Sequence, residues 1–172
     1  MQKLLLWILL VLVCTSCYTD IDEPWLGQDS FYTSYEPILM ERGEMEASIA
    51  SLSPRIIEST GKIYFYNSYI FLVEQYSGVH VINNSNPRNP IPIAFLQIPG
   101  CVDVAVKSDI LYADNAVDLL SIDISNITDI QVVNRQKDVF PELPPPDFGN
   151  LPASFEKENR PENTLIVGWK KS

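Results

Sequence analysis

The middle part of the sequence repeats itself, and this feature limits the possible folds more than any other. When the chain is shifted by 40 positions, five identical residues coincide within fewer than 20 positions. The identical pairs are Ser68 and Ser108, Ile70 and Ile110, Ile82 and Ile122, Ser85 and Ser125, and Asn86 and Asn126. A period of about 40 residues with four short strands in each unit is typical of β-propeller blades. We therefore expect about two propeller-like repeat units, at about residues 61–100 and 101–140.

Short runs rich in Ile, Val, Tyr and Phe begin with RIIE at Arg55, just before the first unit, and continue through both units. Such residues favour strands because branched and aromatic side chains pack well on a pleated surface. Two-residue connections at Asn67-Ser68 and Lys107-Ser108 suit tight antiparallel hairpins. The predicted fold class is all-β, with antiparallel blades. Because stacked repeats need three or more units, two units predict self-association through open sheet edges, coverage by the leader and tail, or a shortened relative of a longer propeller.

Three other segments flank the repeats. Residues 38–50 carry apolar side chains at helical spacing, which predicts a short helix, although Gly43 weakens it by about 1 kcal/mol relative to Ala. Residues 141–163 hold six of the 13 prolines and predict a semi-rigid connecting loop. Residues 164–172 begin with TLIVGW and predict a terminal strand, a fragment of a third unit.

Residues 1–16 have the pattern of a signal peptide. One basic residue, Lys3, precedes an apolar run from Leu4 to Val13, which is too short to cross a bilayer that needs about 20 residues. The residues that follow resemble a bacterial lipobox, with small residues before Cys17 as the lipid acceptor. The resemblance implies lipidation of Cys17. The alternative is an ordinary secretory signal that leaves a soluble product.

Acidic residues crowd the segment behind Cys17, including Asp20, Asp22 and Glu23. Residues 17–37 are therefore expected to form a lipidated acidic tether and extended leader. The tract is similar to the acidic stretch that directs some lipoproteins to the outer face of the outer membrane, which implies display on the cell surface. The alternative is a solvated, self-repelling tether.

The chemistry-bearing residues are few. Cys101 is the one cysteine left after processing and lipidation, so no intrachain disulfide is expected, and Cys101 is predicted to be a small buried residue. His80 is the single histidine and is predicted to be a half-exposed strand side chain; a Ser-His-Asp arrangement using it stays open, without a GxSxG motif. Glu74 and Asp114 occupy equivalent positions and are expected to cap or bridge the turn after their strands.

Acidic residues also gather in the second unit, at Asp103, Asp114, Asp118 and Asp123. Oxygen clusters can bind calcium, but the DxDxDG spacing is absent and solvated strand ends are the preferred interpretation. Neither a metal, a cofactor nor a catalytic residue is predicted, and the ligand-binding residues are left open.

The phrases YIFLVEQYSGVHVINNSNPRNP and DILYADNAVDLLSIDISNITDI resemble the LVIVD repeat of bacterial surface lipoproteins. The first unit matches that repeat well, with Gly78 before its second strand. The second unit departs from it, with Asp118 in place of the glycine and Ile127 and Ile130 in place of the two prolines. The resemblance covers about half of the chain and implies a propeller-like fold and an envelope location, in a short or truncated member of the family. It implies no activity.

Charge and composition narrow the function further. The net charge of −10 argues against nucleic-acid binding, because few basic residues are available to displace counterions from phosphates. We expect a non-enzymatic lipoprotein anchored in the outer membrane, with a binding or assembly role and a protein partner. The alternative is a surface hydrolase or glycan-processing accessory protein that uses carboxylates on the blade surface. Clustered aromatic residues make glycan a further candidate ligand.

Overall fold

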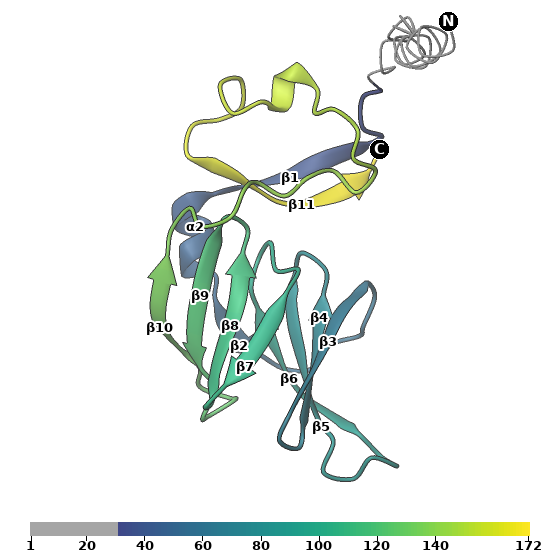
Figure 1. The fold of residues 1–172 in the computed structure, drawn as a ribbon, viewed down its shortest axis with the longest axis vertical. Helices are drawn as coiled ribbons and strands as arrows, with labels where there is room; N and C mark the ends of the chain where they lie inside the picture. Colours follow the sequence, from purple (N-terminus) through teal and green to yellow (C-terminus); the bar gives the residue numbers. More distant parts are fainter. Residues whose placement is uncertain (1–30) are drawn as a thin grey trace, which may run out of the picture. The chain divides into compact units, whose positions relative to one another are not determined.

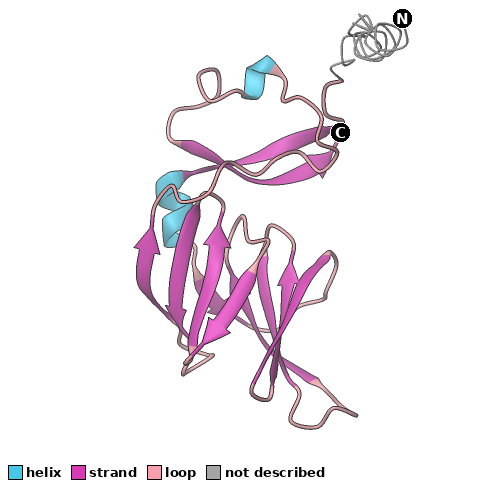
Figure 2. Cartoon of the chain, viewed as in Figure 1, coloured by secondary structure: helices cyan, strands magenta, loops and turns pink. Residues whose placement is uncertain are grey.

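A computed structural model describes residues Phe31–Ser172, which form one compact unit. The predicted signal peptide (1–16), the lipidation site Cys17 and the tether as far as residue 30 lie outside the described residues. The described part is mostly β-structure, in antiparallel sheets none of which closes on itself (Figures 1 and 2). The predicted all-β class is therefore confirmed at this level.

Two sheets and a two-stranded ribbon make up the unit. The first sheet contains β2 (Ala50–Leu52), β3 (Thr60–Tyr66), β4 (Tyr69–Glu74), β5 (Gly78–Asn83) and β6 (Ile91–Gln97), in the order β2-β6-β5-β4-β3. The second sheet contains β7 (Val104–Lys107), β8 (Ile110–Asn115), β9 (Asp118–Asp123) and β10 (Gln131–Gln136), in the order β10-β9-β8-β7. Each repeat is thus a four-stranded meander, and β2 adds a fifth strand to the first.

The loops that follow β5 and β9 are alike in detail. Ser85 N–H donates to Asn83 Oδ1 at 2.9 Å, and Ser125 N–H donates to Asp123 Oδ1 at 2.9 Å. The next turn of each loop repeats too, since Asn86 Oδ1 and Asn126 Oδ1 each accept from the backbone N–H two residues later at 3.2 Å. Asn, Asp and Ser favour such turns because their side chains bond to nearby backbone groups. The repeated Asn and Ser of the sequence therefore have the same role in both units.

The spacing of the repeat is not uniform from strand to strand. The register pairs Glu74 with Gly78 across three turn residues in the first sheet, but Asn115 with Asp118 across two in the second. As a result a shift of 40 positions carries β5 and β6 onto β9 and β10, whereas β4 (69–74) needs one position more to coincide with β8 (110–115). The alignment of Ile70 with Ile110 was therefore wrong by one position, and the structural counterpart of Glu74 is Asn115 rather than Asp114.

Two local predictions also need correction. The tight connection between β7 and β8 is Ser108-Asp109, one residue later than predicted, and both residues have positive φ, at 51° and 59°. The run RIIE at 55–58 forms no strand. Residues 53–59 form an irregular strap that contacts Phe95 of β6 and Glu74 of β4. The predicted connection Asn67-Ser68 between β3 and β4 is confirmed.

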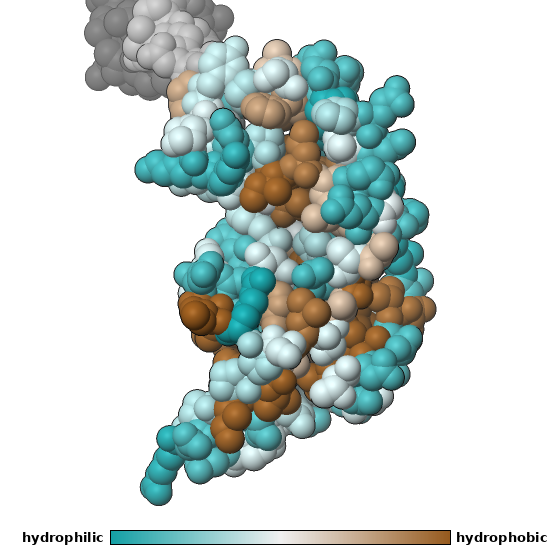
Figure 3. Space-filling view, turned by 180° about the vertical axis from the view of Figure 1, so that it is seen from behind, coloured by the Kyte–Doolittle hydropathy of each residue, from teal (hydrophilic) through white to brown (hydrophobic). Residues whose placement is uncertain are grey.

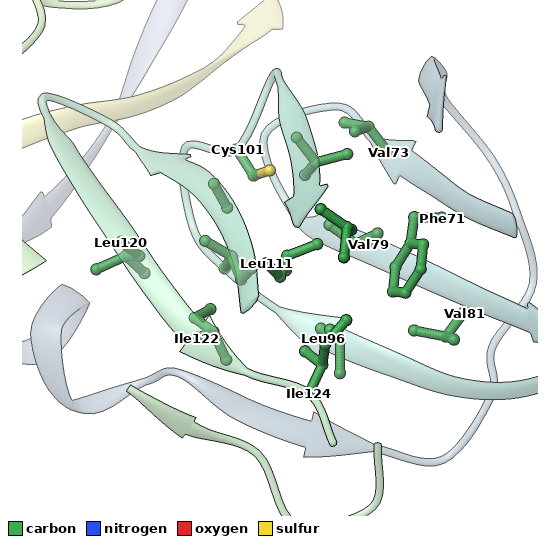
Figure 4. Packing of buried hydrophobic residues seen from close by; sticks show 14 of the residues in the cluster. Phe71, Val73, Val79, Val81, Leu96, Cys101, Leu111, Leu120, Ile122 and Ile124 are labelled. Atoms are coloured by element: carbon green, nitrogen blue, oxygen red, sulfur yellow. The ribbon is translucent and has the colours of Figure 1, made fainter. Parts of the chain in front are cut away.

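The main apolar core lies between the two sheets (Figure 4). The first sheet contributes Phe71, Val73, Val79, Val81, Ala94 and Leu96, and the second contributes Val104, Val106, Leu111, Ala113, Leu120 and Ile122. Cys101 lies among them, fully buried, as predicted. Burial of these side chains is the main driving force for holding the sheets together.

The terminal strand pairs with the leader rather than with a third repeat. β11 (Thr164–Lys171) is antiparallel to β1 (Tyr35–Glu41), and the two form the ribbon. The predicted helix at 38–50 is therefore limited to α2 (Arg42–Ala47), because residues 38–41 belong to β1. Buried Leu165 and Val167 of β11 pack with Met45 of α2 and with the β8–β9 turn.

A charge network holds α2 against the second sheet. Asp118 is fully buried at the start of β9 and receives hydrogen bonds from Arg42 of α2 and Arg135 of β10, at 3.2 Å and 2.8 Å. Burial would raise the pKa of Asp118, but the Asp138 backbone N–H and the two arginines outweigh it and lower the pKa. A buried carboxylate needs such partners, so Asp118 has a structural role.

The proline-rich segment 141–163 contains a single 3-10 turn (Ala153–Phe155) and lies along the ribbon. Asp147 anchors it by accepting hydrogen bonds from Ser34 N–H at 2.9 Å and from the Thr33 hydroxyl at 2.7 Å, and these bonds lower the pKa of Asp147. Trp169 Nε1 of β11 donates to the Leu143 carbonyl. The segment is a connecting loop, as predicted.

Candidate functional site

The two sheets pack through opposite faces of the repeat. β5 turns Val79 and Val81 toward the second sheet, whereas β9 turns Leu120 and Ile122 toward the first sheet. The positions in β5 that match Leu120 and Ile122 are His80 and Ile82, which lie on the other side of β5. The two sheets therefore pack head-to-tail. One face of a repeat can pack against the repeat that follows it in the chain, and the opposite face against a repeat that precedes it.

Within residues 31–172, no further sheet packs on the face of the first repeat that would receive a preceding repeat. Val104 and Val106 of β7 are 2% and 5% exposed in the core, whereas their counterparts in β3, Ile63 and Phe65, are 66% and 61% exposed. The outer face of the first sheet is defined here by Ile63, Phe65, Ile70, Leu72, His80, Ile82 and Phe95. Apart from His80 these positions are apolar, so the face has the composition of a buried interface.

Apolar side chains continue beside this face. Leu52 at the end of β2 is 43% exposed, and Ile56 in the strap is 82% exposed. Figure 3, in which the molecule is seen from behind, shows apolar atoms at the surface over the two sheets. Contiguous exposed apolar residues commonly mark an interaction site in a soluble protein.

The outer face of the second sheet is much more polar. Its residues are the counterparts of the first sheet's core residues, one for one. Phe71, Val73, Val79, Val81, Ala94 and Leu96 are matched by Tyr112, Asp114, Leu119, Ser121, Asn134 and Gln136. Terminal repeats of stacked proteins typically have a polar outer face that ends the stack. The second sheet therefore ends the stack, whereas the first sheet does not.

The strap at 53–59 covers one end of the outer face. The Arg55 guanidinium lies 3.7 Å from the centroid of the Phe95 ring, a cation–π contact. Glu74 Oε2 accepts from the Glu58 N–H at 3.2 Å, and Glu74 Oε1 accepts from the Ser59 N–H at 2.5 Å. These contacts hold the strap over Phe95 and leave Ile63 and Phe65 uncovered.

Glu74 and His80 form a buried pair beneath the strap. His80 is 1% exposed rather than half-exposed as predicted, and its Nε2 lies 2.9 Å from Glu74 Oε2. The His80 ring also packs against Phe95, with ring centroids 4.9 Å apart. Burial would raise the pKa of Glu74, but the hydrogen bonds from His80, Ser59 and Glu58 outweigh it and lower the pKa.

The prediction that Glu74 and Asp114 cap or bridge the turn after their strands was wrong. Each carboxylate instead accepts backbone N–H groups from the segment before the first strand of its own repeat, β3 for Glu74 and β7 for Asp114. For Asp114 the donors are Val102 and Asp103, at 3.0 Å and 2.8 Å. Burial raises the pKa of Asp114 despite these bonds, and burial also raises the pKa of the nearby Cys101 thiol. The two acids therefore position the chain where it enters each repeat.

The other acidic residues of the second unit do not converge. Asp103 pairs with Lys62, Asp118 with the two arginines, and Asp123 with the backbone of Ser125. Within residues 31–172, no group of three or more His, Cys, Asp or Glu side chains is arranged to hold a metal ion. The carboxylates considered for calcium thus have separate structural partners.

A groove of about 660 Å³ lies between the ribbon and the end of the first sheet. Tyr35, Tyr76 and Trp169 line it together with polar side chains, among them Gln75 and Gln97. Tyr76 has a positive φ of 66° and packs on Gly168, where a Cβ would lie 2.9 Å from the Tyr76 Cβ. Aromatic rings beside amide groups suit the apolar faces and hydroxyl groups of sugars.

Comparison with known proteins adds no relative. No model of a known protein family matches the chain, and neither a curated protein nor a solved structure is significantly similar to it. Within the described residues, no helix has the length and apolar character needed to cross a bilayer.

The Glu74 contacts generate a prediction for stability. Glu74→Gln removes the charge that accepts three hydrogen bonds, and we expect it to lower the free energy of unfolding by about 1.5–3 kcal/mol near neutral pH. Because folding lowers the Glu74 pKa, this stabilisation is complete above the ordinary value of 4.5 and is lost as the pH falls through the folded value. Urea unfolding of both proteins from pH 7 to pH 3 should therefore show a shrinking difference.

Glu58→Gln is the matched control for this prediction. The Glu58 side chain is exposed, and its backbone N–H, which donates to Glu74, is kept in the variant. We expect a change within about 0.5 kcal/mol. Equal effects of the two substitutions would contradict the anchoring role of Glu74.

Proposed function

We propose that this chain is a non-enzymatic lipoprotein of the bacterial outer membrane, anchored through Cys17, with an assembly role. In this proposal it is a short member of the LVIVD-repeat family of surface lipoproteins, and its two sheets are propeller-like blades. The observation that carries the assembly role is the outer face of the first sheet, where Ile63 and Phe65 are exposed although their counterparts are buried. The function is to bind a protein partner at that face.

The head-to-tail contact of the two sheets supports the propeller-like interpretation. In a stacked repeat array each unit contacts only its neighbours, through one face on each side. Two sheets that share a strand order and use opposite faces fit this arrangement. A sandwich of two sheets related by a two-fold axis would instead use the same face of each repeat.

The arrangement of polar groups supports a non-enzymatic role. Catalytic groups need access to a substrate, but His80 is 1% exposed and its Nε2 is directed at Glu74. Asp118 is fully buried between two arginines. These residues are held by structural partners, whereas the exposed residues of the outer face, Ile63 and Phe65, are apolar.

Glycan binding is a second candidate function, favoured by the groove beside the ribbon. The rings of Tyr35 and Tyr76 and the amide of Gln75 would meet a sugar there. This role is compatible with assembly at the outer face, because the lining residues of the groove do not include Ile63 or Phe65.

Replacing the lipid acceptor tests the anchor. We expect Cys17→Ala to move the protein from the membrane fraction to the soluble fraction, because the acyl chains provide the membrane affinity. Cys14→Ala is the control and should leave the protein in the membrane. Fractionation of cells with detection of the protein measures both, and unchanged membrane retention of Cys17→Ala would contradict the anchor.

Photo-cross-linking tests the assembly role. A photoreactive amino acid at position 65 should give an adduct with a protein in intact cells, because this position lies on the outer face of the first sheet. The same amino acid at position 112, on the outer face of the second sheet, is the control and should give much less. The assembly role is wrong if position 65 gives no adduct, or no more than position 112.

A further inference from the structure

We infer that the partner at the outer face of the first sheet is a second copy of this chain, bound around a two-fold axis. This inference rests on the proposed assembly role and names its partner. The resulting dimer would stack four sheets in the order second, first, first, second. Each copy would cover Ile63 and Phe65 of the other.

The contact between the first and second sheets shows how the residues of the outer face would be buried by a neighbour. In the second repeat, the positions equivalent to Ile63 and Phe65 are Val104 and Val106, which lie in a core built from both sheets. The first repeat keeps apolar residues at these positions, and no sheet of the described part of the chain covers them. Removing apolar surface from water is favourable, so covering this face favours association.

The polar end of the stack decides which arrangement two copies can adopt. A head-to-tail assembly would place the outer face of one copy's second sheet on the outer face of the next copy's first sheet. The second sheet has Ser121, Asn134 and Gln136 where the first sheet has Val81, Ala94 and Leu96 in its core. Burial of those polar groups without partners would be costly. Two copies are therefore expected to pair through the same apolar face, as in the common two-fold dimers.

Charge favours the same arrangement. The chain has a net charge of −10, so two copies repel each other over most of their surface. None of the seven residues that define the outer face is acidic. The carboxylate beside them, Glu74, is buried and hydrogen-bonded to His80. The exposed strap beside the face carries Arg55 and Glu58, which are of opposite sign and can pair between two-fold related copies. The face is thus a surface where an acidic chain can meet its copy.

The mass of the full chain in detergent tests the inference. Sedimentation equilibrium under conditions that match the density of the detergent should give twice the mass of one chain. Phe65→Glu should raise the dissociation constant of the dimer at least tenfold, because it places a carboxylate on each copy at the buried interface. Val133→Glu is the matched control, since Val133 on the edge strand β10 is 55% exposed, close to the 61% of Phe65. It should leave the mass unchanged.

The other outcomes overturn the inference. A wild-type mass of one chain excludes a second copy at this face. A dimer that Val133→Glu dissociates and Phe65→Glu does not would place the contact at the sheet edge. Circular dichroism melting of both variants checks that they are folded, and both positions are exposed, so little loss of stability is expected. A monomer that still gives a photo-adduct from position 65 with another protein would overturn this inference and leave the assembly role standing.

Discussion

The apolar contact between the two sheets is the interaction on which the rest of this structure depends. It buries Leu111, Leu120 and Ile122 of one repeat against Phe71 and Val79 of the other. Because the two repeats use opposite faces, the contact also determines what remains exposed at each end of the stack. The second sheet ends in polar residues, and the first ends in the apolar outer face.

The local devices around the sheets serve this contact. Glu74 and Asp114 hold the chain where it enters each repeat, although they are not structural counterparts of each other. The segment before β7 passes through the core with Cys101, whereas the strap before β3 lies on the outer face with Ile56 exposed. The segment that leads into the repeat is therefore buried in the second repeat and exposed to solvent in the first. This difference is the basis of the proposed dimer.

Much of the fold could be predicted from the sequence because the repeat is local. The loops with Asn86 and Asn126 and the hairpin at Asn67-Ser68 depend on residues within a few positions. The one-residue difference between the β4–β5 and β8–β9 turns was missed, because a single fixed shift aligns more identical residues than a shift that changes between strands.

Features that depend on contacts between distant parts of the chain could not be predicted from the sequence. The pairing of β1 with β11 joins segments from opposite ends of the described chain, and no local pattern indicates it. His80 was expected to be half-exposed because nothing in GVHVI shows that a distant strap covers it. The exposed face also could not be recognised, since Ile63 and Phe65 have the same alternation as the buried Val104 and Val106. One sequence signal could have indicated it. When the repeats are aligned strand by strand, polar residues of the second repeat stand where the first repeat has core residues.

The most direct test of this account compares two neighbouring leucines of β9. Leu120 is fully buried between the sheets, whereas Leu119 points to the opposite, polar face and is partly exposed. We expect Leu120→Ala to lower the free energy of unfolding by about 2–5 kcal/mol, and Leu119→Ala to lower it clearly less. Urea unfolding of the two variants beside the unaltered protein measures both values. Equal losses, or a larger loss for Leu119→Ala, would contradict the packing of the two repeats through opposite faces.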